Sequence, residues 1–162
     1  MDAQKIVYVI GIPLVELLLI LCGAFFAATE TGYTSLSRIT VRQMLKGKEK
    51  NASLVSRLRS NLDGLISTAL VGTNLVTTLI SSLATAYAIE LFGDGYVSLA
   101  TAAVSILVII FSEIIPKTYA ALRPKESAVM SARPILLLQR LFFPVWTALS
   151  FRVVSAAEGS KE

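Results

Sequence analysis

The sequence has no histidine and only one cysteine, Cys22. A single cysteine cannot form an intramolecular disulfide, and without histidine the chain lacks the usual ligands of a zinc site. Histidine is also the commonest general base, so its absence argues against an enzyme and predicts a protein without catalytic residues. Cys22 is then most simply a small packing or lipid-facing residue.

Charge is also scarce. Charged residues make up 16% of the 162 residues, compared with about 25% in soluble domains. The apolar fraction is 54% and the mean hydropathy is +0.69. Because the apolar residues gather in long runs, the composition indicates an integral membrane protein. The predicted fold class is all-α, with three transmembrane helices and a belt of amphipathic juxtamembrane helices on the cytoplasmic side.

Lysine and arginine are missing from the whole stretch between Ser60 and Pro116. The basic residues lie instead at 38–59 and from Lys117 onward, beside the apolar runs. This is the positive-inside pattern of a multi-pass protein of the cell (inner or plasma) membrane, with basic loops and C-terminus cytoplasmic. The net charge of +4 therefore indicates contact with membrane lipid and no nucleic-acid partner.

Three apolar runs predict spans at about 6–31, 62–91 and 96–120, each long enough for a hydrocarbon core of about 30 Å. The first exceeds the about 7–15 residues of a signal-peptide core and carries Glu16, so we favour a span over a cleaved signal. Glu16 receives no assigned role. The turn "FGDGY" contains no basic residue, which predicts that it lies outside, as does the N-terminus.

Two segments have apolar residues at helical spacing opposite basic ones, at about 35–60 and 130–155. They read as amphipathic helices on the cytoplasmic surface, and "GKEKN" breaks the first. Residues 132–150 could also form a fourth span, although Arg133, Arg140 and Arg152 favour the surface. The predicted transmembrane domain covers residues 1–155, followed by a tail or linker at 156–162.

The stretch "FSEIIPKTYA" places a carboxylate, a proline and a lysine at the end of an apolar run. An ionisable group there costs about 2.5–3.5 kcal/mol, so Glu113 needs a partner or a purpose. Pro116 has no N–H, which predicts a kink and a bare Ser112 carbonyl beside the Glu113 carboxylate. The alternative is a simple proline kink with Glu113 paired to Lys117 at i, i+4.

The other two spans add polar groups. Ser67 and Asn74 are seven residues apart, about two turns, and so share a helix face. Glu30 and Lys117 lie near the ends of their helices, where they could also snorkel to the interface. An all-oxygen donor set predicts Mg²⁺, Ca²⁺ or Na⁺. The predicted metal ligands are Glu113, Ser67, Asn74, Ser112 and Thr29; Pro116 breaks the helix, Lys117 and Glu30 balance charge, and Gly72 and Thr73 permit close helix approach.

Three stretches, "FFAATETGYTSLSR", "LISTALVGTNLV" and "SEIIPKTYA", resemble in order and spacing the transmembrane domain of the CNNM/CorC magnesium transporters. The resemblance covers about residues 5–150. It implies three spans, a basic cytoplasmic belt and a homodimer, with Mg²⁺ export driven by Na⁺ entry and a largely dehydrated ion among the helices. It also implies a cytosolic CBS-pair domain in the full-length protein, which nothing in this sequence resembles.

The resemblance assigns the family motifs to particular residues. Its Glu-Ile-x-Pro-Lys motif falls on Glu113, Ile114, Pro116 and Lys117; its second-helix motif falls on Ser67, Gly72, Thr73 and Asn74; its first-helix motif falls on residues 25–31. Two kinds of departure occur. Ser112 stands where the family commonly has glycine, and Gly23 and Ala27 stand where many relatives carry serine.

Two functions follow from these residues. The first is a secondary transporter that exports Mg²⁺ in exchange for Na⁺. The second is a membrane module that binds Mg²⁺ without transporting it and acts as a sensor or regulator of a partner protein. A hydrolase would need a Ser112–Lys117 dyad, whose five-residue separation places the two side chains on poorly matched helix faces.

Overall fold

A computed structural model describes residues 3–158, and the side chains of residues 9–91, 93 and 95–141. All regular elements in this range are helical, and they are connected by short turns. The elements are α1 (Ala3–Ser35), α2 (Arg38–Lys46), α3 (Ala52–Ser60), α4 (Leu62–Phe92), the 3₁₀ turn η1 (Asp94–Tyr96), α5 (Val97–Val108), the π-helical segment η2 (Ile109–Ile114), α6 (Ile115–Leu122) and α7 (Pro124–Glu158).

Three helical stretches are long and apolar enough to cross a membrane: Val9–Ser35, Leu62–Leu91 and Val97–Leu122. The third consists of α5, η2 and α6 in direct succession. Large apolar side chains such as Leu17, Leu21 and Leu107 are at least half exposed, as expected for helix faces that contact lipid. The prediction of an all-α membrane protein with three spans is confirmed.

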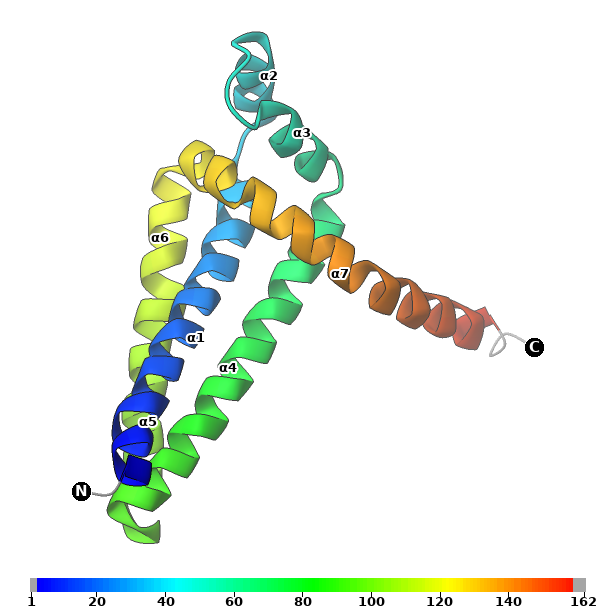
Figure 1. Cartoon of the computed structure of the whole chain (residues 1–162). Coiled ribbons are helices and arrows are strands. Elements are labelled where there is room, and N and C mark those ends of the chain that lie inside the picture. The colour runs from blue at the N-terminus through cyan, green and yellow to red at the C-terminus, as the bar shows by residue number, and fades with distance from the viewer. Residues whose placement is uncertain (1–2, 159–162) are drawn as a thin grey trace.

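Helix α1 is the centre of the bundle, between α4 on one side and α6 on the other (Figure 1). It runs parallel to α5 and α6 and antiparallel to α4. Two contacts fix its register against α4: the Tyr87 hydroxyl donates to the Val9 carbonyl (3.2 Å), and Gly72 faces the Phe26 ring. These contacts determine which polar residues of the two helices lie at the same depth.

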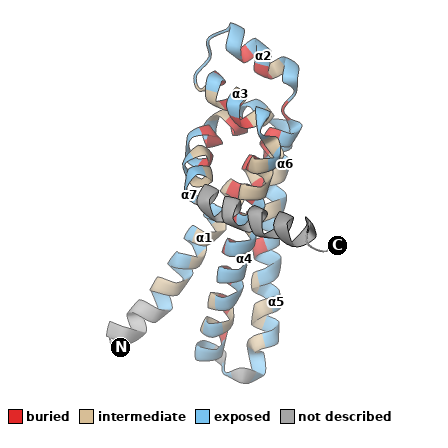
Figure 2. Cartoon of the chain, turned by 90° about the vertical axis from the view of Figure 1, so that its right-hand side faces the viewer, coloured by how far each residue is buried: buried red, intermediate tan, exposed pale blue. Residues whose placement is uncertain are grey.

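Short helices α2 and α3 cover the basic end of the bundle. Helix α2 begins at Ser37, whose hydroxyl accepts a hydrogen bond from the Thr40 N–H (3.0 Å), a typical N-cap. It buries Val41 and Met44, three residues apart, while its basic residues stay exposed. Figure 2 shows buried residues gathered where α3 and α7 meet the ends of the spans, and mostly exposed residues lower down.

Helix α7 crosses the ends of the spans and does not run beside them (Figure 1). It begins at Pro124, six residues before the expected start at 130, and is described as far as Glu158. Among the described residues it is not one of the helices apolar enough to span a membrane. This arrangement favours the surface position for residues 132–150. The end of the expected tail, residues 159–162, lies outside the described range.

The start of α7 is clamped onto α1. The Ser127 hydroxyl donates to the Ala28 carbonyl (2.9 Å), and the Tyr33 hydroxyl donates to the Ala128 carbonyl (3.1 Å). A Cβ at Gly32 would lie 2.7 Å from Ser127 Oγ and 2.9 Å from Ser127 Cβ. The two helices therefore approach so closely that only glycine fits at position 32 without displacing α7.

This contact generates a stability prediction. In an ordinary helix, Gly→Ala stabilises by about 0.5–1 kcal/mol. We expect Gly32→Ala to have the opposite sign and to destabilise by about 1–3 kcal/mol, because the added methyl overpacks the α1–α7 contact. Thermal unfolding of the detergent-solubilised protein measures the change.

Gly95→Ala is the control, because a Cβ at Gly95 meets nothing within 4 Å. Its unfolding temperature should stay close to that of the wild type. Equal unfolding temperatures for the Gly32 and Gly95 variants would show that α1 and α7 do not pack as closely as described.

Candidate functional site

The third span changes its helical register just before Pro116. Residues 109–114 form a π-helical segment, in which the Ile115 N–H donates to the Ile110 carbonyl, five residues earlier. The Phe111 carbonyl would accept from the N–H of residue 115 in an α-helix or of residue 116 in a π-helix. The Ile115 N–H is already bonded to Ile110 and Pro116 has no N–H, so neither can bond to the Phe111 carbonyl. The sequence predicted a kink with a bare Ser112 carbonyl. The structure instead absorbs the proline in a π-bulge, a feature frequent at functional sites.

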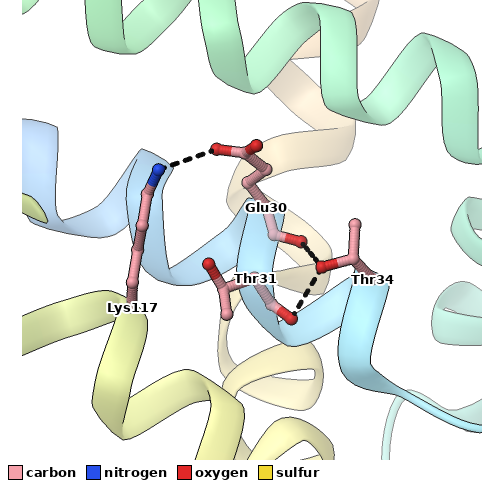
Figure 3. Close-up of polar contacts among 4 residues, drawn as sticks. All are labelled: Glu30, Thr31, Thr34 and Lys117. Carbon is pink, nitrogen blue, oxygen red and sulfur yellow. Dashed lines mark hydrogen bonds and ion pairs between the residues drawn. The ribbon is translucent and has the colours of Figure 1, made fainter. Parts of the chain in front are cut away.

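Lys117 pairs with Glu30 of α1, not with Glu113. Its Nζ lies 3.6 Å from Glu30 Oε2, and the Lys117 and Glu30 side chains are 43% and 22% exposed. Figure 3 shows Lys117 reaching from α6 across to α1. The alternative Glu113–Lys117 pair does not form. Among the residues described, no cationic side chain lies within ion-pair distance of the half-buried Glu113 carboxylate.

The remaining polar groups around Glu30 bond to the backbone. The Thr34 hydroxyl lies 3.0 Å from the Glu30 carbonyl and 3.1 Å from the Thr31 carbonyl, as Figure 3 shows. These contacts satisfy carbonyls in the last turns of α1. They leave the Glu30 carboxylate to Lys117.

Ser112 is completely buried, and its hydroxyl has no hydrogen-bond partner. The hydroxyl lies where α1 and α4 approach the π-helical segment. A Cβ placed at Gly23 would overlap Ser112 Oγ and would lie 3.5 Å from Val76 Cγ1 on α4. Sequence reasoning singled out the Ser112 carbonyl and overlooked the hydroxyl, because the rotation of the helix at this point depends on the π-bulge.

Thr73 on α4 has a second buried hydroxyl oxygen without a partner. Thr73 is next to Gly72, which was expected to allow the backbone of another helix to approach closely. A Cβ at Gly72 would instead meet the Phe26 ring, 2.5 Å from Cε1. The glycine thus accommodates an aromatic side chain, and the Thr73 hydroxyl was missed as a candidate donor because the spacing suggested only a packing role.

The predicted ligands lie at two depths. The Val76–Gly23 contact puts Val76 level with the Ser112 hydroxyl, so Asn74 and Thr73 lie about 3 and 4.5 Å along the helix axis from it, toward the basic end. Ser67 is seven residues from Asn74, or about 10 Å along the helix axis. We define the midspan layer as Thr73, Asn74, Ser112 and Glu113, and the basic-end layer as Thr29, Glu30, Ser67 and Lys117.

A bare ion bound at the Ser112 hydroxyl cannot also contact Thr29. Thr29 is six residues beyond Gly23, or about 9 Å along the axis, whereas Mg²⁺ binds oxygen at about 2.0–2.1 Å. The Thr29 hydroxyl is buried and donates to the Phe25 carbonyl (2.7 Å). In contrast with the convergence expected from sequence, Ser67 and Thr29 therefore belong to a separate position nearer the basic end.

Asn74 is exposed on α4, about half a turn from Gly72 and Val76, which face α1, so it lies on the other side of the helix from the Ser112 hydroxyl. It continues into a row of hydroxyl-bearing residues. The hydroxyls of four residues in this row, Thr77, Thr78, Ser82 and Thr85, bond to backbone carbonyls of their own helix. Thr78, for example, donates to the Asn74 carbonyl (2.8 Å). A shallow, open hollow runs along this face, lined by Thr77, Thr78, Ser81, Ser82 and Thr85.

Carboxylates do not cluster in the described part of the chain. No group of three or more Asp, Glu, Cys or His side chains there could hold a metal ion. Two further buried oxygens, Glu16 Oε1 and Thr101 Oγ1, have no hydrogen-bond partner. A cation in the midspan layer would thus be held by one carboxylate together with neutral hydroxyl and carbonyl oxygens, a donor set suited to a hard cation.

Residues 14–156 match the family model described as the cyclin M transmembrane N-terminal domain (CNNM). The inner membrane protein YfjD of Escherichia coli, a UPF0053 protein, is 40% identical over 125 residues, covering 76% of this chain and 29% of YfjD. A UPF0053 protein of Haemophilus influenzae is 35% identical over 142 residues, covering 84% of this chain and 34% of that protein.

A DUF21 domain-containing chloroplastic protein of Arabidopsis thaliana is 31% identical over 129 residues, covering 80% of this chain and 20% of the plant protein. The chain thus spans about a third or less of the length of these relatives. The family model nevertheless covers most of this chain, including most of the first span and the whole of the other two. The protein is a multi-pass membrane domain of the CNNM (DUF21/UPF0053) family.

Proposed function

We propose that this domain binds Mg²⁺ between its helices and exports it in exchange for Na⁺, without acting as an enzyme. The observation that carries the proposal is the Glu113 carboxylate, which lies in a membrane span without a cationic partner among the described residues. An unpaired carboxylate there is expensive unless a cation neutralises it. The nearest lysine along the helix, Lys117, is already paired with Glu30.

In this proposal Glu113 supplies the charged ligand of a largely dehydrated ion. Ser112 adds an oxygen from the same turn and the register change at Pro116 a free carbonyl. Asn74, the predicted amide ligand, is exposed on the other side of α4 and lies on the face that a second copy could cover. Ser67 and Thr29 act in the basic-end layer, as a second position on the route between the midspan layer and the cytoplasm. Discontinuous helices commonly provide such carbonyl ligands in secondary transporters.

Coupling to Na⁺ follows from the membrane potential. With the basic segments cytoplasmic and the potential negative inside, each Na⁺ that enters releases about 2.3 kcal/mol per 100 mV. Exporting Mg²⁺ moves two charges against the same field. More than one Na⁺ per Mg²⁺ would make the exchange favourable, and Lys117 would balance charge when the ion leaves.

A homodimer and a cytosolic CBS-pair domain in the full-length protein are part of the same proposal. The exposed face of α4, from Asn74 through Thr78 and Ser82, supports the first. Small hydroxyl-bearing residues allow close approach between membrane helices, and a second copy could cover this face. The relatives are much longer than this chain, which leaves room for a CBS-pair domain in the full-length protein.

The alternative is a module that binds Mg²⁺ without moving it and regulates a partner protein. The same oxygen donors serve both functions, since a binding site is not by itself a pathway. The two layers of polar groups favour transport, because a fixed sensor needs only one position. Ion movement decides between them.

Glu113→Gln tests the site in liposomes that contain a Mg²⁺ indicator. The substitution keeps the side-chain size and one oxygen but removes the charge. We expect Na⁺-gradient-dependent Mg²⁺ movement by the wild type and a fall of at least about tenfold in the variant, equivalent to about 1.4 kcal/mol.

Glu90→Gln is the matched control, because Glu90 is exposed in the last turns of α4, away from both layers. It should transport like the wild type. Saturable Mg²⁺ binding with no flux in the wild type would favour the sensor. Undiminished flux in the Glu113 variant would refute the assignment of the charged ligand.

The Lys117–Glu30 pair generates a second prediction. Glu30→Gln removes the partner of Lys117, and the freed ammonium can then turn to Glu113, four residues earlier on the same helix. We expect Mg²⁺ affinity to fall several-fold, as measured by the Mg²⁺-dependent rise in unfolding temperature. Adding Lys117→Gln to this variant should restore affinity, because the competing cation is removed.

Glu49→Gln serves as the comparison. It breaks the 2.8 Å pair with Lys125 in the juxtamembrane belt and should leave Mg²⁺ affinity unchanged. A double variant no better than Glu30→Gln alone would mean that Lys117 does not compete with the ion for Glu113.

A further inference from the structure

We infer that the hydroxyl of Ser112 occupies the space that a side chain at position 23 of α1 would fill, and that it supplies the ion with a hydroxyl ligand from the third span in place of one from the first. The inference rests on the proposed function, because it concerns the same Mg²⁺ site. In this inference Ser112 contributes its side-chain hydroxyl oxygen to the ion, and not its backbone carbonyl oxygen.

The geometry leaves room for only one side chain. A Cβ at Gly23 would overlap Ser112 Oγ and would lie 3.4 Å from Ser112 Cβ. Side chains at both positions would therefore collide, whereas glycine at both would leave a gap between α1 and the π-helical segment. Gly23 and Ser112 share one space, and the hydroxyl enters it from η2.

The hydroxyl has no other task in the described structure. Ser112 is 0% exposed and its Oγ has no hydrogen-bond partner. A buried hydroxyl that forgoes its hydrogen bonds destabilises the fold, and most buried hydroxyls are satisfied. Several other hydroxyls of the spans, such as those of Thr68 and Thr77, bond to their own helix. Coordination of a cation would satisfy the Ser112 oxygen.

The surroundings of the hydroxyl suit a cation. Glu113, the next residue, provides a negative charge without a cationic partner among the described side chains. Thr73 Oγ1 on α4, about 4.5 Å along the axis toward the basic end, is also buried and without a partner. Oxygens from two spans, one of them charged, thus lie within one turn of each other in depth.

The contact also accounts for two departures from the family pattern. Ser112 stands where glycine is common in the family, and Gly23 stands where serine is. The structure shows that these two positions face one another. In this chain the space between the two positions holds the hydroxyl of Ser112.

The test places serine at position 23 and glycine at position 112, separately and together. The full chain is prepared with Gly23→Ser, with Ser112→Gly, with both, and with Ser112→Ala. For each, the unfolding temperature is measured in detergent and K⁺ buffer over a Mg²⁺ titration, so that stability without Mg²⁺ and affinity are read separately. Ser131→Ala is the control, because Ser131 is a buried serine of α7 whose hydroxyl donates to the Ser127 carbonyl.

We expect Ser112→Ala and Ser112→Gly to lose roughly tenfold or more in Mg²⁺ affinity, since removal of even indirect supports of a metal site costs about 10–100-fold. Gly23→Ser alone should lower the unfolding temperature without Mg²⁺, because two side chains collide. The double variant should recover both the unfolding temperature and most of the affinity. Ser131→Ala should bind Mg²⁺ like the wild type.

Two results would overturn the inference: wild-type affinity in Ser112→Ala, or a double variant no more stable than Gly23→Ser and no tighter than Ser112→Gly. Glu113→Gln in the same titration separates the causes. If only that variant loses Mg²⁺, the role of the Ser112 hydroxyl fails and the proposed function stands. If neither Glu113→Gln nor Ser112→Ala weakens binding, the proposed site itself fails.

Discussion

The missing N–H of Pro116 is the constraint on which the candidate site depends. In a membrane span each carbonyl must find its donor within the helix or face a cavity or ligand, and a proline four residues beyond Ser112 removes one donor. The chain responds with a π-helical register over Ile109–Ile114. The shift turns the Ser112 hydroxyl toward α1 and α4 and leaves Lys117 able to reach Glu30. One covalent feature thus determines both the free carboxylate and its buried neighbour.

Helix α1 turns this local change into a three-dimensional site, because it contacts both other spans and α7. Glycines at 23 and 32 permit its two closest approaches, to Ser112 and to Ser127. The second of these anchors the juxtamembrane belt, through the Tyr33 and Ser127 hydrogen bonds. Movement of α7 would therefore act directly on the helix that bears one wall of the candidate site.

Much of the architecture could be predicted from the sequence, because membrane spans are defined by long apolar runs that a single chain displays directly. The three spans, the break near residues 47–51 and the helical character of the belt all follow from such patterns. The partner of Lys117 could not be predicted in this way. Spacing along one helix offered Glu113, four residues away, as the alternative partner, but the structure brings Glu30 of α1 within reach of Lys117.

The depth of each predicted ligand along the helix bundle could not be predicted from the sequence either. Ser67 and Asn74 share a helix face, which suggested a common ion, but a shared face does not mean a shared depth. Only the contacts of Phe26 with Gly72 and of Gly23 with Val76 reveal the two layers. The unpartnered hydroxyls of Ser112 and Thr73 likewise depend on how three helices rotate about their axes, and the π-bulge alters that rotation in a way that no apolar period records.

The most direct test of this account is to locate the cation itself. Crystals of the protein grown with Mn²⁺ in place of Mg²⁺ would give an anomalous difference map in which the metal stands out from all lighter atoms. The account predicts a peak in the midspan layer, at a metal–oxygen distance of about 2.0–2.6 Å from both the Glu113 carboxylate and Ser112 Oγ. A peak elsewhere, such as beside Glu16 and Thr101, or a fully occupied peak that Glu113 does not touch, would contradict it.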